Sequence, residues 1–260
     1  MGEIWIYPGD EKVTLEAYPA GDSALGAVVI CPGGAYRYVS PRESGPVARA
    51  FNREGFTAFV LNYSCENPPL QKRPLQQLSW AVSKVKAAAK EYGYSRDRVF
   101  TCGFSAGGHL AASLGVTWHL PEWYEEGTDL ELHRPAGQIL CYPVITAGEY
   151  AHRGSFEHLA GESREEQEPY SLENLITDKT PPTFLWHTME DETVPVENTL
   201  LFSERLKEAK IAQEVHLFPY GRHGLSLATK EVEEVSAGRH PDPHVARWFA
   251  LAAEWLKNCF

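Results

Sequence analysis

Short apolar runs alternate with longer amphipathic segments along most of this 260-residue chain. The runs are rich in β-branched and aromatic residues and too short for helices, so they predict buried strands. The segments between them repeat apolar residues at helical spacing and predict helices. This order is typical of an α/β fold, in which helices cover both faces of a mostly parallel central sheet. We expect the central strands within residues 27–34, 56–64, 98–104, 138–145, 183–188 and 214–220.

Two edge strands are expected at the N-terminus, in residues 4–7 and 13–18, because the sequence Pro-Gly-Asp at residues 8–10 is a turn signal. Further along, Leu75 and Leu78 with two valines lie at a spacing that places them on one face of a helix. The predicted helices are residues 46–55, 74–94, 106–116, 197–210 and 244–260.

Two segments break the alternation, residues 117–135 and 146–182, and both are rich in Glu, Pro, Gly and aromatic residues. Irregular insertions of this length in a compact domain are usually lids or binding loops. No internal repeat or domain boundary is evident, so we expect a single domain over residues 1–260. The side chains of the insertions that are candidates for substrate contact, with packing inside a lid as the alternative, are His119, His133, His152, His158, Trp118, Trp123, Tyr124, Tyr150, Phe156 and Tyr170.

The formal net charge of −11 excludes some partners. An acidic surface repels phosphate backbones and anionic lipids, so we expect no nucleic acid and no membrane among the partners. No apolar run approaches the roughly 20 residues that span a bilayer. The N-terminal sequence MGEIWIYPGDEK lacks the basic start and apolar stretch of a secretory signal. These features predict a cytoplasmic protein, and they leave the oligomeric state open.

The five cysteines are spaced neither as a zinc knuckle nor as a redox motif. Three of them, Cys31, Cys102 and Cys141, lie inside strand-like apolar runs. A free cysteine in such a run packs as a small apolar residue. The cysteines therefore predict core packing and no metal site.

Residues 103–107, Gly-Phe-Ser-Ala-Gly, fit the pattern G-x-S-x-G at the junction of a predicted strand and a predicted helix. This is the setting of a nucleophile elbow, a tight turn that exposes the serine oxygen at the carboxyl edge of the sheet. Glycines on both sides are needed because a Cβ would crowd the neighbouring backbone. A glycine-rich turn without chemistry is the alternative, but the residues described next favour Ser105 as a nucleophile.

A serine hydroxyl becomes a good nucleophile when a histidine removes its proton and an acid orients that histidine. In folds of this kind the acid and then the histidine follow the serine along the chain. His223 lies just after the last predicted strand and is the predicted base. His109, on the helix behind the serine, and His187, inside a strand, are expected to be buried packing or hydrogen-bonding residues.

Three carboxylates compete for the role of the acid, because Glu190, Asp191 and Glu192 follow the strand at 183–188. We favour Asp191, since Val194 and the proline after it fix the loop that presents this side chain. Glu190 and Glu192 are then solvated charges.

The sequence Gly-Gly-Ala-Tyr at residues 33–36 follows the first central strand and lies opposite the elbow. The backbone N–H groups of Gly34 and Ala35, together with that of Ala106, are predicted to bind the oxygen that becomes negative during acyl transfer. An ordinary Gly-Gly turn is the alternative. Tyr36 is a candidate for substrate binding, either by lining an acyl pocket or by donating a hydrogen bond.

These motifs resemble the α/β-hydrolase superfamily, and more narrowly its small esterases of the acetyl-xylan-esterase and acetyl-esterase group, related to the hormone-sensitive-lipase branch. The resemblance runs from about residue 27 to residue 224 and rests on CPGGAY, GFSAGGHLAASL, CYPVI, YSLENLITDKTPPTFLWHTMEDETVPVEN and YGRHG. It implies an α/β-hydrolase fold and deacylation of short esters, often acetyl groups on plant polysaccharides, without a metal or organic cofactor. The chain departs from the lipase branch at Pro32, where histidine is usual, and at Ala35, where a third glycine is common.

Three functional hypotheses follow. The first is a serine carboxylesterase that hydrolyses short-chain acyl esters, with acetylated xylan oligosaccharides as candidate substrates. The second is a peptidase or amidase with the same triad, which is less favoured because no added domain selects peptides. The third is a catalytically silent ligand receptor, which is least favoured because such receptors typically lose a triad member and Ser105, Asp191 and His223 are all present.

Overall fold

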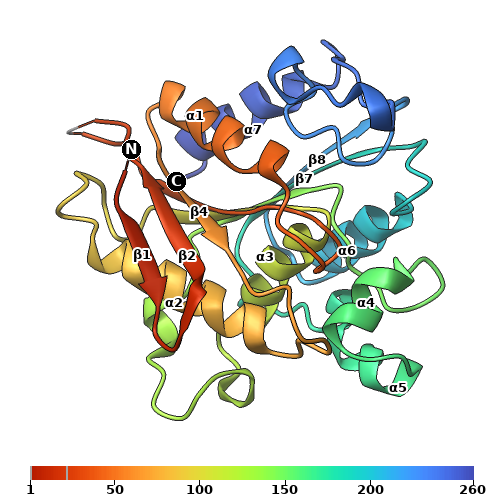
Figure 1. The fold of residues 1–260 in the computed structure, drawn as a ribbon, viewed down its shortest axis with the longest axis horizontal. Coiled ribbons are helices and arrows are strands. Elements are labelled where there is room, and N and C mark those ends of the chain that lie inside the picture. The colour runs from red at the N-terminus through yellow and green to blue at the C-terminus, as the bar shows by residue number, and fades with distance from the viewer. Residues whose placement is uncertain (1, 22) are drawn as a thin grey trace.

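A single eight-stranded sheet runs through the molecule, with helices on both faces (Figure 1). The computed structural model describes residues 2–21 and 23–260. The strands lie in the order β1-β2-β4-β3-β5-β6-β7-β8 across the sheet. They are β1 (Ile4–Tyr7), β2 (Asp10–Tyr18), β3 (Ala27–Cys31), β4 (Thr57–Asn62), β5 (Val99–Phe104), β6 (Gln138–Cys141), β7 (Thr183–Thr188) and β8 (Gln213–Phe218).

From β4 to β8 all neighbouring strands are parallel, whereas β1 and β2 form an antiparallel edge. Every residue of β3, β5, β6 and β7 is buried, as expected for strands that are covered on both faces. The expected mostly parallel α/β sheet is therefore confirmed. The parallel arrangement brings the carboxyl ends of these strands, and the loops that follow them, to one edge.

Four of the predicted helices, at residues 46–55, 106–116, 197–210 and 244–260, agree with the structure to within three residues at each end. The helix predicted at residues 74–94 ends earlier, at Ala87, and two short helices lie inside residues 146–182, which were expected to be irregular. Among the residues that the structure describes, the α-helices are α1 (Gly45–Arg53), α2 (Arg73–Ala87), α3 (Ala106–Thr117), α4 (Arg153–Leu159), α5 (Arg164–Gln167), α6 (Glu197–Glu208) and α7 (Arg247–Asn258). In α2 the predicted apolar face is buried, since Leu75, Leu78, Val82 and Val85 all pack inward.

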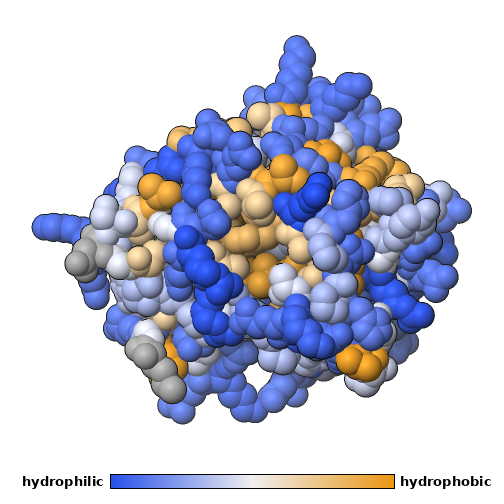
Figure 2. Space-filling view, turned by 90° about the horizontal axis from the view of Figure 1, so that it is seen from above, coloured by the Kyte–Doolittle hydropathy of each residue, from blue (hydrophilic) through white to orange (hydrophobic). Residues whose placement is uncertain are grey.

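Alternate residues of β3 separate the core into its two layers. Val28 and Ile30 pack with α1 and α7 on one side of the sheet. Ala27 and Val29 pack with α2 and α3 on the other, while α6 covers β6 and β7 beside α3. Figure 1 shows α1 and α7 above the sheet and α2 below it. The face with α1 and α7 carries apolar residues in its middle and hydrophilic residues around them (Figure 2).

The first insertion, residues 117–135, folds back as two 3-10 turns, η2 (Pro121–Trp123) and η3 (Leu130–Leu132). Its aromatic side chains Trp118, Trp123 and Tyr124 are buried in the layer formed by α2 and α3. The second insertion contains α4 and α5, and Phe156 of α4 is buried. The aromatic residues of the insertions are thus largely packing residues.

Within the described ranges, no helix is both long and apolar enough to cross a membrane. The same residues contain no group of three or more His, Cys, Asp or Glu side chains arranged to hold a metal ion.

Candidate active site

Ser105 occupies a strained turn between the last residue of β5 and the first residue of α3. Its backbone has φ 53° and ψ −119°, a conformation that L-residues rarely adopt. The flanking glycines make this turn possible. A Cβ on Gly103 would lie 2.1 Å from the carbonyl oxygen of Gly107, and a Cβ on Gly107 would lie 2.0 Å from that of Cys31. Residues 103–107 therefore have the local geometry of a nucleophile elbow.

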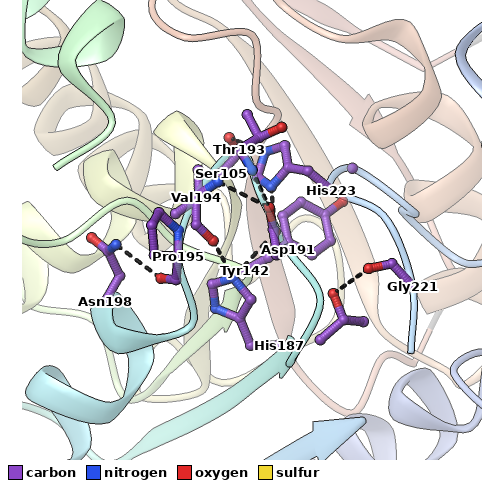
Figure 3. Close-up of polar contacts among 12 residues, drawn as sticks. Ser105, Tyr142, His187, Asp191, Thr193, Val194, Pro195, Asn198, Gly221 and His223 are labelled. Atoms are coloured by element: carbon purple, nitrogen blue, oxygen red, sulfur yellow. Dashed lines mark hydrogen bonds and ion pairs between the residues drawn. The ribbon is translucent and has the colours of Figure 1, made fainter. Parts of the chain in front are cut away.

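Ser105, His223 and Asp191 form one hydrogen-bonded chain (Figure 3). Ser105 Oγ lies 2.8 Å from His223 Nε2, and His223 Nδ1 lies 2.6 Å from Asp191 Oδ2. The ionised carboxylate can only accept, so His223 carries its proton on Nδ1 and its Nε2 accepts the serine hydroxyl. This tautomer leaves His223 ready to take the Ser105 proton.

The three side chains come from loops at the carboxyl ends of different strands. Ser105 follows β5, Asp191 follows β7 and His223 follows β8. The sequence placed each of these residues in the segment where the structure has it. Glu190 and Glu192, the competing acids, are exposed and form no hydrogen bond to His223, whereas Asp191 is only 5% exposed.

Four hydrogen bonds fix the Asp191 carboxylate. Oδ1 accepts from the backbone N–H groups of Thr193 and Val194 at 3.0 and 2.9 Å. Oδ2 accepts from His223 and, at 3.2 Å, from His187 Nε2. Burial raises the pKa of Asp191, but the hydrogen bonds from His187 and His223 outweigh it and hold the pKa well below its usual range. Asp191 is therefore a fixed anion.

His187 is fully buried, as the sequence predicted, and its hydrogen bonds define its tautomer. Nε2 lies within reach of two acceptors, Asp191 Oδ2 and the Val194 carbonyl at 2.9 Å, so it carries the proton. Nδ1 then accepts from the Thr199 hydroxyl at 2.8 Å. The ring braces Asp191 from the side opposite His223 (Figure 3). No local pattern indicates that this histidine contacts the acid.

The loop at residues 33–36 turns through three consecutive positive φ angles, 134° at Gly34, 55° at Ala35 and 60° at Tyr36. Ala35 thus adopts the left-handed conformation that a third glycine would take more easily. The backbone N–H groups of Gly34, Ala35 and Ala106 donate no hydrogen bond within the described residues. They are available to an anion, as the sequence-based hypothesis requires.

Tyr36 does not line the cavity around Ser105, contrary to its predicted position. The side chain is 1% exposed, and its hydroxyl donates to His109 Nδ1 at 2.9 Å. His109 Nε2 in turn donates to the Tyr170 carbonyl at 2.9 Å, and burial lowers the pKa of His109 to about 4. The exposed neighbour Tyr38 lines the cavity instead. Tyr36 and His109 thus support the loop from beneath.

Glu43, which the sequence analysis missed, joins three loops of the site. It is 3% exposed and lines the cavity. Oε2 accepts from the backbone N–H of Gly33 at 2.7 Å, and Oε1 accepts from the Tyr142 hydroxyl at 2.6 Å. The same hydroxyl accepts from the backbone N–H of Ser226 at 2.9 Å. The Tyr142 ring also packs edge-on against His223 at 5.1 Å between centroids. One carboxylate thereby connects the loop at residues 33–36 with the ring and the loop that position His223.

The cavity around Ser105 has a volume of about 250 Å³, and its lining combines polar and charged side chains with apolar surface. Of the four insertion histidines, only His152 reaches it, and residues 117–135 contribute nothing. Burial, followed by the charges of His223 and Arg37, lowers the pKa of His152. The segment between β8 and α7 supplies Glu234 and Arg239, although the sequence analysis did not single it out. The signal that could have identified this segment is its length of more than 20 residues, because long loops in a compact domain are often functional.

Comparisons with known proteins relate this chain to esterases and xylan-acting hydrolases. The endo-1,4-beta-xylanase B of Butyrivibrio fibrisolvens is 39% identical over 210 residues, which cover 78% of this chain and 33% of that protein. The acetylxylan esterase of Xylanibacter ruminicola is 28% identical over 85% of this chain and 45% of its own length. The chain therefore spans between a third and a half of the length of these relatives.

A solved structure with similar size is the acetyl ester-xyloside bifunctional hydrolase of Caldicellulosiruptor lactoaceticus. It superposes with a TM-score of 0.82 at 36% identity and covers 95% of this chain and 88% of its own. The BD-FAE family matches residues 17–134, and the prolyl oligopeptidase family matches residues 81–260. The fold and the site define an α/β hydrolase. Within this superfamily the chain belongs to the prolyl oligopeptidase family, with esterases among its relatives.

The low pKa of Asp191 predicts a pH-dependent stability contribution. A carboxylate whose pKa is depressed by folding stabilises the folded state above the ordinary carboxyl pKa of about 4, and this contribution is lost as the pH falls through the folded value. We expect Asp191→Asn to lower the free energy of unfolding at about pH 7, and the difference from the wild type to shrink towards about pH 3. Urea unfolding at each pH measures this difference in the free energy of unfolding, with a variant at an exposed carboxylate, Glu192→Gln, as control. A difference that stays constant over this range contradicts the assignment.

Glu43→Gln is expected to lower kcat by about tenfold, with a smaller change in KM, because the loops shift relative to the serine. A glutamine cannot accept from both Gly33 and Tyr142, so one of these groups is left unpaired, which costs about 1–3 kcal/mol of stability. Steady-state kinetics and urea unfolding give the two quantities. The exposed Glu204→Gln is the control, and wild-type kcat in Glu43→Gln contradicts the role of this carboxylate.

Proposed function

We propose that this chain is a serine carboxylesterase that removes small acyl groups, acetyl in particular, from carbohydrate esters. The observation that carries the proposal is the chain of hydrogen bonds from Ser105 through His223 to Asp191, with Ser105 and His223 lining a small cavity.

In the proposed mechanism, Ser105 Oγ attacks the ester carbonyl while His223 Nε2 takes the hydroxyl proton. The carbonyl oxygen becomes negative and is stabilised by the N–H groups of Gly34, Ala35 and Ala106. The tetrahedral adduct collapses to an acyl-enzyme, and the proton on His223 passes to the departing alcohol. Water then loses a proton to His223, attacks the acyl-enzyme and releases the acid, and the proton returns to Ser105. Asp191 stays ionised throughout and stabilises the imidazolium.

The cavity supports small and polar substrates. Polar or charged side chains, among them Arg42, Thr193 and Arg239, surround Ser105. The apolar surface of the lining, which includes Ala35 and Pro41, lies among these charged groups, so a long acyl chain would desolvate them. An acetyl group on a hydroxyl-rich alcohol suits this lining. Two relatives, an acetylxylan esterase and an acetyl ester-xyloside bifunctional hydrolase, support acetylated carbohydrates as the substrate class.

A peptidase is the second candidate, because the prolyl oligopeptidase family matches residues 81–260. The same triad attacks an amide by the same steps, so the two activities differ in the leaving group that His223 protonates. Rates on an N-acylated peptide p-nitroanilide, compared with p-nitrophenyl acetate, separate the two candidates. The proposal requires the ester to be the better substrate by kcat/KM.

Ser105→Ala and His223→Ala are each expected to lower kcat on p-nitrophenyl acetate by about a million-fold, and Asp191→Asn by about ten-thousand-fold. Glu190→Gln and Glu192→Gln serve as matched acid controls with rates near the wild type. Circular dichroism establishes that each variant is folded. Near-normal turnover in a folded Ser105 or His223 variant contradicts the proposal. If Glu190→Gln or Glu192→Gln lowers the rate while Asp191→Asn stays active, the acid of the triad is that glutamate and not Asp191.

We also expect kcat/KM to fall from p-nitrophenyl acetate to butyrate and octanoate, and acetate to be released from acetylated xylo-oligosaccharide. The physical reason is the small volume of the cavity, about 250 Å³, together with the charged side chains in its lining, which a longer acyl chain would desolvate. Equal or rising rates with chain length contradict acetyl preference while leaving the esterase activity in place.

A further inference from the structure

A second cavity of about 430 Å³ lies beside the cavity around Ser105. It is formed between β2, the end of β4 and the loop after it, with Val13 and Tyr63 among its walls. Tyr38 lines both cavities, so they meet at this side chain. Nothing in the proposed mechanism uses the second cavity.

The lining of the second cavity suits a neutral ligand rich in hydroxyl groups. Its side chains include carboxylates, amides, a hydroxyl and cationic groups, so it presents both donors and acceptors of hydrogen bonds. Two carboxylates and three cationic groups line the cavity, so most of the charge is offset, and Lys12 is paired with Glu66 at 2.6 Å. An anion would meet Asp10 and Glu66, and an alkyl chain would desolvate these charges.

Tyr38 forms the ridge between the two cavities, and Arg37, next to it in the sequence, lines the second cavity. Both side chains are exposed, Tyr38 by 58%, and they follow the loop that lies opposite Ser105. The Arg37 guanidinium has no hydrogen bond or ion pair with any other described residue. It also lies near His152, which lines the cavity of Ser105. Tyr38 therefore offers an aromatic face at the exit from the catalytic cavity, and the Arg37 guanidinium beside it offers N–H donors to a ligand in the second cavity.

The wall of the second cavity opposite the ridge is held in place by hydrogen bonds. Arg73 donates to the backbone carbonyls of Glu66 and Asn67 at 3.2 and 3.0 Å. Gln77 donates to the Ser64 hydroxyl at 2.6 Å and accepts from its backbone N–H at 2.8 Å. A preformed wall reduces the entropy lost when a ligand binds.

We propose that the second cavity is a subsite for a neutral oligosaccharide, the alcohol part of the substrate. The acetylated sugar lies at Ser105, and the next sugar units cross Tyr38, whose ring stacks on a sugar face. The following units lie in the cavity, where Arg37 and the polar wall bind their hydroxyl groups. This inference rests on the proposed function and deepens it, because it makes the substrate an oligosaccharide rather than a single sugar.

The test compares kcat/KM on acetylated xylotriose with that on acetylated methyl xyloside. In the wild type we expect a ratio of about five to ten in favour of the trisaccharide, the size of one stacking contact with added hydrogen bonds. Tyr38→Ala and Arg37→Ala each bring the ratio close to one. Tyr220→Ala is the matched control, because Tyr220 is also an exposed tyrosine, at 68%, and lines neither cavity. A wild-type ratio near one, or a ratio that Tyr38→Ala leaves unchanged, overturns the subsite.

Calorimetric titration of Ser105→Ala with unacetylated xylotriose gives a readout that needs no turnover. We expect binding that is weakened about tenfold when Tyr38→Ala is added. If no acetylated sugar is hydrolysed but this binding is found, the subsite stands and the proposed esterase function falls. If acetylated sugars are hydrolysed and xylotriose does not bind, the subsite falls and the proposed function stands.

Discussion

The backbone turn at Ser105 is the constraint on which the other features of the site depend. Its φ of 53° is unfavourable for a serine, and the surrounding strands hold it there because β5 is buried on both faces between β3 and β6. The Ser105 N–H donates to the Cys141 carbonyl of β6 at 3.0 Å, and its carbonyl accepts from Val144 at 3.1 Å. The sheet thereby fixes where Oγ lies, and every other group must reach that point.

The groups that reach the Ser105 hydroxyl lie in loops, and hydrogen bonds make these loops rigid. His223 lies in a loop whose carbonyls are held by arginines: Arg239 donates to the carbonyl of His223 at 2.9 Å, and Arg42 to that of Gly224 at 2.8 Å. Glu43 and Tyr142 connect this loop to the opposite side of the cavity, and His187 steadies the acid from behind. Such cross-links preorganise a site, so that little rearrangement is needed when charge develops.

The sequence predicted the parts of this arrangement that depend on periodicity and chain order. The strands, the elbow and the position of a histidine after the last strand follow from local pattern. Asp191 was favoured over its neighbours because Val194 and the proline after it fix the loop that presents this side chain. In the structure its carboxylate accepts from the backbone N–H groups of Thr193 and Val194, as aspartate often does in turns.

The remainder depends on contacts that no local pattern encodes. Glu43 meets Tyr142 across 99 residues, and nothing near Glu43 distinguishes it from a surface carboxylate. Tyr38 rather than Tyr36 faces the cavity because the positive φ angles at Ala35 and Tyr36 turn the chain, and the usual alternation of side chains does not hold there. Residues 117–135 resemble a lid in composition, yet their aromatic residues are packed against the layer of α2 and α3.

The most direct test of the account is whether Ser105 alone among the serines is activated by His223. Incubation with diethyl p-nitrophenyl phosphate, followed by intact mass measurement and peptide mapping, detects a covalent diethylphosphoryl group on an activated serine. The account predicts one adduct per chain, on Ser105, formed rapidly in the wild type and abolished in practice by His223→Ala. Labelling of another residue, or labelling of Ser105 at the same rate without His223, would contradict the central claim.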